Sequence, residues 1–321
     1  DGPILWTKGE ISMPLANEYQ VMFEQLAAAG PAPSVRDLPV ADGRELYRAA
    51  RAVNPDLPIH KISDATLPGP DGAIPIRIYQ PQGDGPFGVL VYFHGGGWVI
   101  GDLDTADAVC REIATLAELV VVSVDYRLAP EHVYPAAVED SYAALEWVYA
   151  NLQTLQGNGK IGVCGESAGG NLAAVIAQQS RDQGGPPIAF QCLLYPVTDA
   201  EMGRPSYSEN GSGYLLETAT MEWFWDTYCP DPEQRLESGA SPLRAKNLAQ
   251  LPPALVVTAE FDPLRDEGNA YAQALQAAGN TATLLCCDGL VHDFFSTAAV
   301  FACSRAPFEK TISALREYLN T

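Results

Sequence analysis

The feature that most constrains the fold of this chain is the alternation, from Ile74 onward, of short apolar runs with amphipathic helical patterns. The central runs are apolar at consecutive positions, which is typical of strands covered on both faces. Between the runs, apolar residues recur at helical spacing, as in the stretch 138–149. We therefore predict an α/β fold with a largely parallel sheet and helices on both faces. The runs expected to form strands are Ile74–Tyr79, Gly88–Phe93, Leu119–Val124, Ile161–Cys164, Ala189–Tyr195, Ala254–Thr258 and Ala282–Cys287.

Two helical patterns precede this alternation. The first includes Tyr19, Met22 and Phe23 and meets a stop signal at Pro31. The second is weaker and covers residues 46–53. Prolines between and after the two patterns predict two separate helices.

A long stretch from Val197 to Leu251 carries no strand pattern. A structureless loop of that length is improbable in a compact domain. The stretch contains an aromatic cluster, Trp223–Tyr228, for which we expect an inserted helix that walls a pocket together with the first N-terminal helix. Ordinary core packing of these aromatic side chains is an equally good interpretation.

Composition restricts the class of protein. Of the 321 residues, 47% are apolar, which provides enough material for a large core and excludes a disordered chain. The chain has 19 basic and 40 acidic residues, a net charge of −21, so nucleic acids and anionic membrane surfaces are unfavourable partners. No apolar run approaches the roughly 20 residues that cross a bilayer.

The cysteines and the N-terminus predict a cytoplasmic protein. The 7 cysteines are scattered and form no C-x-x-C pair, which favours free thiols in a reducing compartment over disulfides or a zinc site. The stretch Asp1–Glu10 shows no signal-peptide pattern. The segment Gly157–Gly162 fits G-x-G-x-x-G, but it precedes a predicted strand, so a dinucleotide site is rejected and no cofactor or metal is expected.

The strongest chemical signal is the segment Gly165–Gly169, which fits G-x-S-x-G with Ser167 at its centre. It follows a predicted strand and precedes a helical pattern, the context in which this motif presents a nucleophilic serine at a sharp turn. The N–H groups at the start of the following helix favour negative charge at this point. Ser167 is therefore the candidate nucleophile.

A second signal, His94–Trp98, follows the predicted strand that ends at Phe93. Its sequence His-Gly-Gly-Gly is typical of loops whose backbone N–H groups stabilise the oxyanion of acyl transfer. The glycines allow the backbone a close approach to the reacting oxygen. We expect His94 to hold this loop in place.

A serine nucleophile needs a base and an acid that orients the base. The chain has 4 histidines, and the order Ser…Asp…His selects His292, which follows the last predicted strand. Asp262 is the favoured acid, because it stands where the chain leaves the penultimate strand. The other carboxylates within reach by sequence remain open as alternatives; they are Glu260, Asp266, Asp288 and Asp293.

Taken together, these motifs resemble the hormone-sensitive-lipase family of bacterial esterases, within the α/β-hydrolases. The resemblance rests on four segments in order: His94–Trp98, Tyr126–Glu131, Gly165–Gly170 and Asp262–Asp266. It is clear from about Gly88 to Phe294 and fades outside these limits and in the insertion. It implies an eight-stranded, mostly parallel sheet with a helical cap, built from an N-terminal segment at 1–60 and an insertion around 201–235 of the catalytic domain 61–321.

The resemblance also implies the activity. It predicts a carboxylesterase that hydrolyses short-chain esters through an acyl-enzyme, with Ser167, His292 and Asp262 as the triad. The oxyanion donors of the family map onto Gly95, Gly96 and Ala168. The substrate pocket is expected to include Trp98, Tyr195, Trp223 and Phe224.

One departure and several alternatives accompany this prediction. Members of the family commonly have glycine after the catalytic histidine, where this chain has Asp293, so the local backbone and the pKa of His292 are open questions. An amidase or a lactone hydrolase would use the same residues. A ligand-binding receptor on the same fold is disfavoured because His292 is present. A homodimer is a further expectation from the family.

Overall fold

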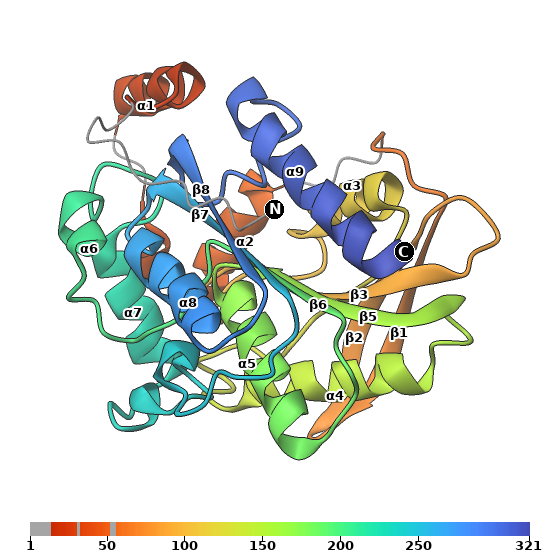
Figure 1. The fold of residues 1–321 in the computed structure, drawn as a ribbon. Helices are drawn as coiled ribbons and strands as arrows, with labels where there is room; N and C mark the ends of the chain where they lie inside the picture. Colours follow the sequence, from red (N-terminus) through yellow and green to blue (C-terminus); the bar gives the residue numbers. More distant parts are fainter. Residues whose placement is uncertain (1–13, 31–32, 52–55) are drawn as a thin grey trace.

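A computed structural model describes residues 14–30, 33–51 and 56–321 (Figure 1). Pro31 and the stretch Asp1–Glu10, on which two of the expectations rest, lie outside the described residues. The helices are α1 (Asn17–Ala29), α2 (Val40–Ala50), α3 (Asp107–Ala117), α4 (Ala136–Ala150), α5 (Ala168–Gln183), α6 (Pro205–Glu209), α7 (Thr218–Tyr228), α8 (Arg265–Ala277) and α9 (Ala302–Asn320), with 3₁₀ turns η1 (Val35–Asp37), η2 (Gln234–Leu236) and η3 (Pro242–Arg244).

One sheet of eight strands forms the centre, as predicted, in the order β1-β2-β4-β3-β5-β6-β7-β8. The pairs β1–β2 and β2–β4 are antiparallel, and all others are parallel. The strands are β1 (Lys61–Gly69), β2 (Gly72–Gln80), β3 (Phe87–Phe93), β4 (Val120–Val124), β5 (Gly157–Glu166), β6 (Phe190–Leu194), β7 (Ala254–Phe261) and β8 (Ala282–Val291).

The sheet separates two hydrophobic cores. In β3, Val89 and Val91 face one core, which α4, α5 and α8 cover, while Leu90 and Tyr92 face the other, which α3 and α9 cover (Figure 1). This two-sided burial explains why the central strands are apolar at consecutive positions.

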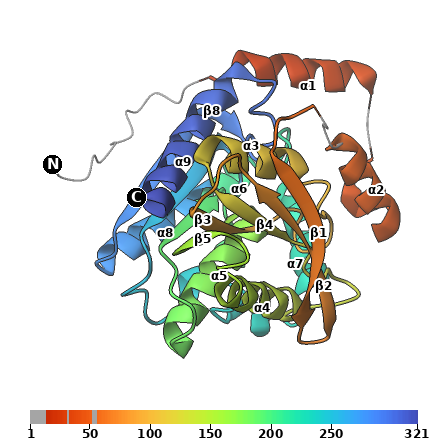
Figure 2. The same cartoon turned by 90° about the vertical axis from the view of Figure 1, so that its right-hand side faces the viewer.

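The first N-terminal helix packs against the C-terminal end of the chain. In Figure 2, α1 lies beside the end of β8 and the start of α9. The Tyr19 side chain is buried, and its hydroxyl lies 2.7 Å from Thr297 Oγ1 and 2.9 Å from Ser304 Oγ. The expectation that Tyr19 walls a pocket in the company of α7 is therefore replaced by a contact with the loop between β8 and α9.

The insertion contains the expected helix. The aromatic cluster Trp223–Tyr228 lies on α7, and Phe224, Trp225 and Tyr228 are buried in the core that also holds Trp98. The Trp98 indole stacks on the Tyr228 ring, with centroids 4.2 Å apart. Core packing is thus the main role of this cluster, although α7 also reaches the site described below.

All 7 cysteines are free, and most are buried. No helix in the described part of the chain combines the length and hydropathy that crossing a membrane requires.

Candidate active site

The site lies where parallel strands end side by side. Phe93 of β3 pairs with Gly165 of β5, so the loop that begins at His94 lies beside the turn of Ser167. Because the carboxyl ends of parallel strands meet at the same edge of a sheet, segments far apart in sequence converge there.

The serine occupies a strained turn between β5 and α5. Its φ is +56°, a region that side chains rarely adopt. A Cβ on Gly165 would lie 2.3 Å from the Gly169 carbonyl carbon, and a Cβ on Gly169 would lie 2.0 Å from the Phe93 oxygen. Glycine at these two positions therefore lets the chain double back and present Ser167 at the end of the sheet.

The structure brings Ser167, His292 and Asp262 into one hydrogen-bonded chain. His292 Nε2 lies 3.0 Å from Ser167 Oγ, and His292 Nδ1 lies 2.7 Å from Asp262 Oδ2. The other oxygen of Asp262 accepts the backbone N–H of Leu264 at 2.8 Å, which fixes the carboxylate. Distances of this size suit a nucleophile, its base and an orienting acid.

The alternative carboxylates have other partners or positions. Glu260 Oε2 accepts the N–H of Gly289 at 2.8 Å, and Asp266 Oδ2 accepts the N–H of Ser206 at 2.9 Å. Asp288 is exposed at the surface. Of the carboxylates considered, Asp262 is the one in contact with the His292 ring.

The electrostatic surroundings of His292 favour its protonated form. Burial is the largest single effect and lowers the pKa of His292, but the charge and hydrogen bond of Asp262, together with the charges of Asp293 and Glu166, outweigh it. The pKa of His292 therefore lies above its ordinary value. The side chains are nearly closed to solvent, since Ser167 is 9% and His292 7% exposed.

The oxyanion loop differs from the expectation at one residue. The N–H of Gly95 donates to Glu166 Oε1 at 3.3 Å, so it is engaged by a carboxylate instead of facing the site. Within the described residues, the N–H groups of Gly96, Gly97 and Ala168 have no acceptor. Ala168 opens α5, where the first N–H groups of a helix have no partner within the helix. Gly96, Gly97 and Ala168 are thus the open donors.

Close packing requires glycine in this loop. A Cβ on Gly96, whose φ is +113°, would lie 2.2 Å from the Ile100 oxygen. A Cβ on Gly97 would lie 2.1 Å from Phe224 Cδ1, which places α7 directly over the loop. Trp223 packs beside Phe224, with ring centroids 5.1 Å apart. Phe224 therefore lies against the oxyanion loop, whereas Trp98 is fully buried within its aromatic cluster.

His94 has the structural role that the sequence predicts. Its ring stacks on Tyr126 at 4.3 Å, and the Tyr126 hydroxyl donates to the His94 carbonyl at 2.8 Å. Burial lowers the pKa of His94 to about 4. A neutral, packed ring of this kind holds the loop and leaves His292 as the candidate base.

Glu166 and Tyr195 form a buried pair beside His292. The Tyr195 hydroxyl donates to Glu166 Oε2 at 3.0 Å, and its ring meets the His292 ring at 4.8 Å. Burial and the nearby Asp293 raise the pKa of Glu166, while Arg51 opposes the rise. Glu166 thus joins the serine turn to the oxyanion loop through Gly95.

Sequence reasoning missed the contribution of Arg51. This residue follows α2, and its Nη2 donates to the Asp293 carboxylate beside His292. No local pattern signals the contact, because 242 positions separate the two residues.

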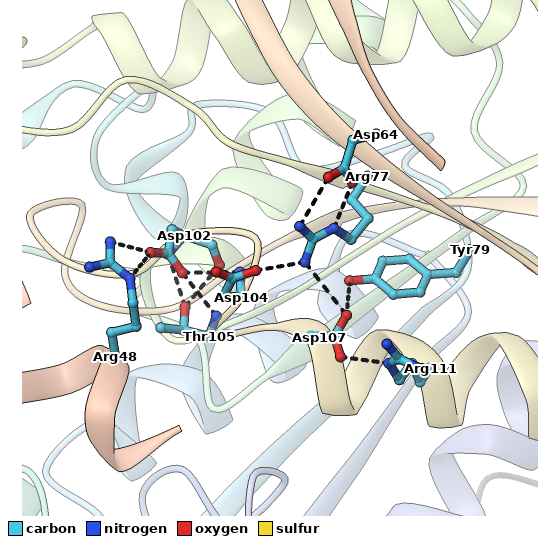
Figure 3. Close-up of polar contacts among 9 residues, drawn as sticks. All are labelled: Arg48, Asp64, Arg77, Tyr79, Asp102, Asp104, Thr105, Asp107 and Arg111. Carbon is cyan, nitrogen blue, oxygen red and sulfur yellow. Dashed lines mark hydrogen bonds and ion pairs between the residues drawn. The ribbon is translucent and has the colours of Figure 1, made fainter. Parts of the chain in front are cut away.

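A cavity elsewhere in the molecule has a structural explanation. It encloses about 350 Å³ and is lined by Ile62, Asp64, Arg77, Asp104, Asp107 and Arg111, none of which belongs to the triad. Figure 3 shows that Arg77 bonds to Asp64 and Asp104, while Asp107 accepts bonds from Arg111 and Tyr79. The charges of this cavity already pair with one another, so the network secures the start of α3 to β2.

Comparisons with known proteins agree with this fold. A family model described as alpha/beta hydrolase fold matches residues 90–296. The chain is 44% identical to carboxylic ester hydrolase LipN of Mycobacterium tuberculosis over 88% of this chain and 77% of that protein. It is 38% identical to ethyl acetate hydrolase of Pseudomonas putida, over 84% and 86% of the two chains. The solved structure of a hyperthermophilic esterase from the archaeon Pyrobaculum calidifontis is 41% identical, covers 95% of this chain and 99% of its own, and gives a TM-score of 0.89.

Proposed function

The chain belongs to the alpha/beta hydrolase fold family, and we propose that it is a carboxylic ester hydrolase in which Ser167 is the nucleophile. The observation that carries the proposal is the hydrogen-bonded chain from Ser167 through His292 to Asp262. The names of the relatives support the reaction class, and the geometry supports the roles of the residues.

The first half of the reaction forms an acyl-enzyme. His292 Nε2 removes the proton of the Ser167 hydroxyl while Oγ attacks the ester carbonyl carbon. The carbonyl electron pair moves onto oxygen, and Asp262 stabilises the imidazolium that forms. The imidazolium then gives its proton to the alcohol oxygen as the carbon–oxygen bond of the ester breaks.

The developing negative charge needs donors that are already in place. The N–H groups of Gly96, Gly97 and Ala168 are such donors. Within the described part of the chain they have no other acceptor, so no hydrogen bond must break before they bind the oxyanion. Gly95 contributes indirectly, because its bond to Glu166 holds the loop against the serine turn.

The second half of the reaction repeats the first with water as the nucleophile. His292 removes a proton from water, the hydroxide attacks the acyl carbon, and Ser167 leaves with the proton from His292. The products are a carboxylic acid and the free enzyme. The steps use only these side chains and water.

A cap over the site supports a preference for short acyl groups. We assign it to the segment 1–60 and the insertion around 201–235 of the catalytic domain 61–321. Arg36 joins the two parts, since its Nη1 donates to Glu217 Oε2 at 2.8 Å and to Thr220 Oγ1 at 2.9 Å. Phe224 packs against the oxyanion loop and Tyr195 against His292, and we expect these aromatic side chains to limit the length of the acyl chain. Activity of a relative on ethyl acetate agrees with small substrates.

The experiment that tests this function is a panel of p-nitrophenyl esters from acetate to palmitate, with Ser167→Ala as the control. We expect kcat/KM to be highest for the short esters. A maximum at long chains would contradict the proposed cap, while activity retained by Ser167→Ala would contradict the nucleophile. Matched amide and lactone substrates in the same panel distinguish an amidase or a lactonase, which would use the same triad.

We also propose a cytoplasmic location and a homodimeric assembly. Free, mostly buried cysteines support a reducing, cytoplasmic setting. The family resemblance supports a homodimer, which light scattering of the purified protein tests. Small esters are the proposed partners, and the net charge of −21 argues against nucleic acids and anionic membranes.

A further inference from the structure

Arginines attach helix α2 to the rest of the protein, in addition to the apolar contacts that the helix makes with the core. Gly43 is the one fully buried residue of the helix. Three arginines, Arg44, Arg48 and Arg51, leave the helix at positions that share one face. The guanidinium group of each arginine donates hydrogen bonds to a carboxylate or a carbonyl oxygen, so these contacts are polar and directional.

The first two arginines bind segments near the oxyanion loop. Arg44 Nε donates to the Val99 carbonyl at 2.8 Å, and its other nitrogens reach Glu131. Arg48 Nε donates to Asp102 Oδ2 at 2.7 Å, as Figure 3 shows. These contacts join α2 to the chain that follows His94–Trp98.

The third arginine binds the residue next to the proposed base. Arg51 Nη2 donates to Asp293 Oδ2, and the Arg51 guanidinium lies 3.8 Å from the centre of the Tyr47 ring. The pair is largely buried, since the side chains of Arg51 and Asp293 are 14% and 18% exposed. A charge pair with so little solvent around it is screened less by salt than a surface pair.

Asp293 has an unusual backbone conformation for a residue with a side chain. Its φ is +69°, a conformation that suits glycine and that aspartate tolerates better than most residues. The Ser296 hydroxyl bonds to both the carbonyl oxygen and the carboxylate of Asp293, which keeps the side chain in the site. Asp293 therefore combines an unfavourable backbone conformation with a carboxylate that pairs with Arg51 at the end of α2.

We propose that Arg51 is a positioning residue that acts on His292 through Asp293, so that the ion pair at the end of α2 sets the protonation of the base. The inference rests on the proposed function, because His292 acts as a base only in that reaction. It extends that function by making the N-terminal segment part of the control of the site.

The groups around His292 predict the direction of the effect. Asp262 bonds to the ring, and the charges of Asp262, Asp293 and Glu166 favour its protonated form, while Tyr195 contacts the ring edge-on. Arg51 is the cation that offsets Asp293 and Glu166. Loss of this cation leaves two carboxylates uncompensated, so the imidazolium becomes more favourable. Loss of the Asp293 charge has the opposite effect.

The test measures the acidic limb of kcat/KM against pH, which reports the protonation of the free enzyme. We expect Arg51→Met to move this limb to higher pH by at least about half a unit, and Asp293→Asn to move it to lower pH. The double variant should lie between them, and Arg51→Lys, which keeps the charge, should stay near the wild type. Each variant is checked by circular dichroism and thermal melting.

Arg48→Met is the matched control. It also removes an arginine pair of α2, but its partner Asp102 is not among the groups that act on His292. It should leave the limb in place. The inference is overturned if Arg51→Met and Asp293→Asn leave the limb unchanged or move it in one direction, or if Arg48→Met moves it as far as Arg51→Met. Because Ser167→Ala tests the proposed function separately, a failure of either claim can be recognised.

Discussion

Tyr195 meets the ring of His292 edge-on, with centroids 4.8 Å apart and planes at 60°, while its hydroxyl donates to Glu166. One side chain therefore contacts the proposed base and the carboxylate that holds Gly95 of the oxyanion loop. Its φ of +35° shows that the backbone after β6 is shaped to bring it there.

Removing the Tyr195 hydroxyl should affect both stability and catalysis. Tyr195→Phe keeps the ring contact but leaves buried Glu166 without one donor, so we expect a loss of about 1–3 kcal/mol in the free energy of unfolding. We also expect a several-fold lower kcat, because the oxyanion loop is held less firmly. Tyr207→Phe is the matched control, since it breaks a similar buried bond to Glu267 at 2.8 Å. Equal kinetic losses in both variants would argue against a specific role for Tyr195.

Ser167→Ala should remove activity while the fold is retained. The hydroxyl has one described partner, His292, so its loss should change the unfolding free energy by only about 1 kcal/mol. We expect kcat to fall by at least roughly 10⁴. Ser141→Ala, which removes a buried hydroxyl in α4, should keep its activity. A serine-reactive phosphonate should label wild type and Ser141→Ala but spare Ser167→Ala.

The carboxylate that orients His292 can be identified by two amide variants. Asp262→Asn keeps the shape of the side chain but favours the wrong tautomer of His292. In serine proteases the corresponding change costs about 10⁴ in kcat, and we expect a similar loss here. Glu260→Gln should cost far less, because Glu260 bonds to the Gly289 backbone. The reverse ranking, with both proteins folded, would assign the role to Glu260.

The geometry of the oxyanion loop predicts a strong effect of a single methyl group. Gly96→Ala should push the loop away from the Ile100 carbonyl and misplace its N–H, which should lower kcat by about 10² or more. Gly159→Ala provides the control, because Gly159 also has a positive φ of +96° but its Cβ would meet nothing within 4 Å. Similar kinetics for the two variants would show that backbone strain, and not the loop position, is the cause.

The raised pKa of His292 fixes the sign of the pH dependence. The base must be neutral to accept the Ser167 proton, so activity should fall as the pH drops through this pKa. Because Asp262 and its neighbours raise the pKa, the midpoint should lie above about 6.5, the ordinary value for histidine. The measurement is kcat/KM for p-nitrophenyl acetate across pH, followed at the isosbestic wavelength of the product. A midpoint well below this value would contradict the electrostatic account.

Strands buried on both faces could be predicted from the sequence, because their pattern is continuous. Strand β1 was missed, since it lies at the edge of the sheet and leaves Asp64 and its neighbours exposed. Helix α3 was missed as well. Its buried apolar residues nevertheless follow helical spacing; they are Val109, Cys110, Ile113, Ala114 and Ala117.

The site could be predicted as far as local motifs and chain order reach. Ser167, His292 and Asp262 are in contact as expected. The engagement of Gly95 by Glu166 depends on a side chain from the neighbouring strand, and the pairing of Arg51 with Asp293 depends on the docking of α2. No spacing rule within one segment encodes contacts of this kind.

The pairing of β7 with β8 has a consequence for heat inactivation. Phe261 and Val291 are partners in this ladder, so Asp262 and His292 are each one residue beyond a shared hydrogen-bonded rung. The gap between acid and base is thus a spacing of the sheet itself, and motion of the surrounding helices changes it little. On heating, enzymatic activity should therefore be lost over the same temperature interval in which the sheet unfolds. We expect no earlier phase in which the sheet is intact but Asp262 and His292 are misaligned.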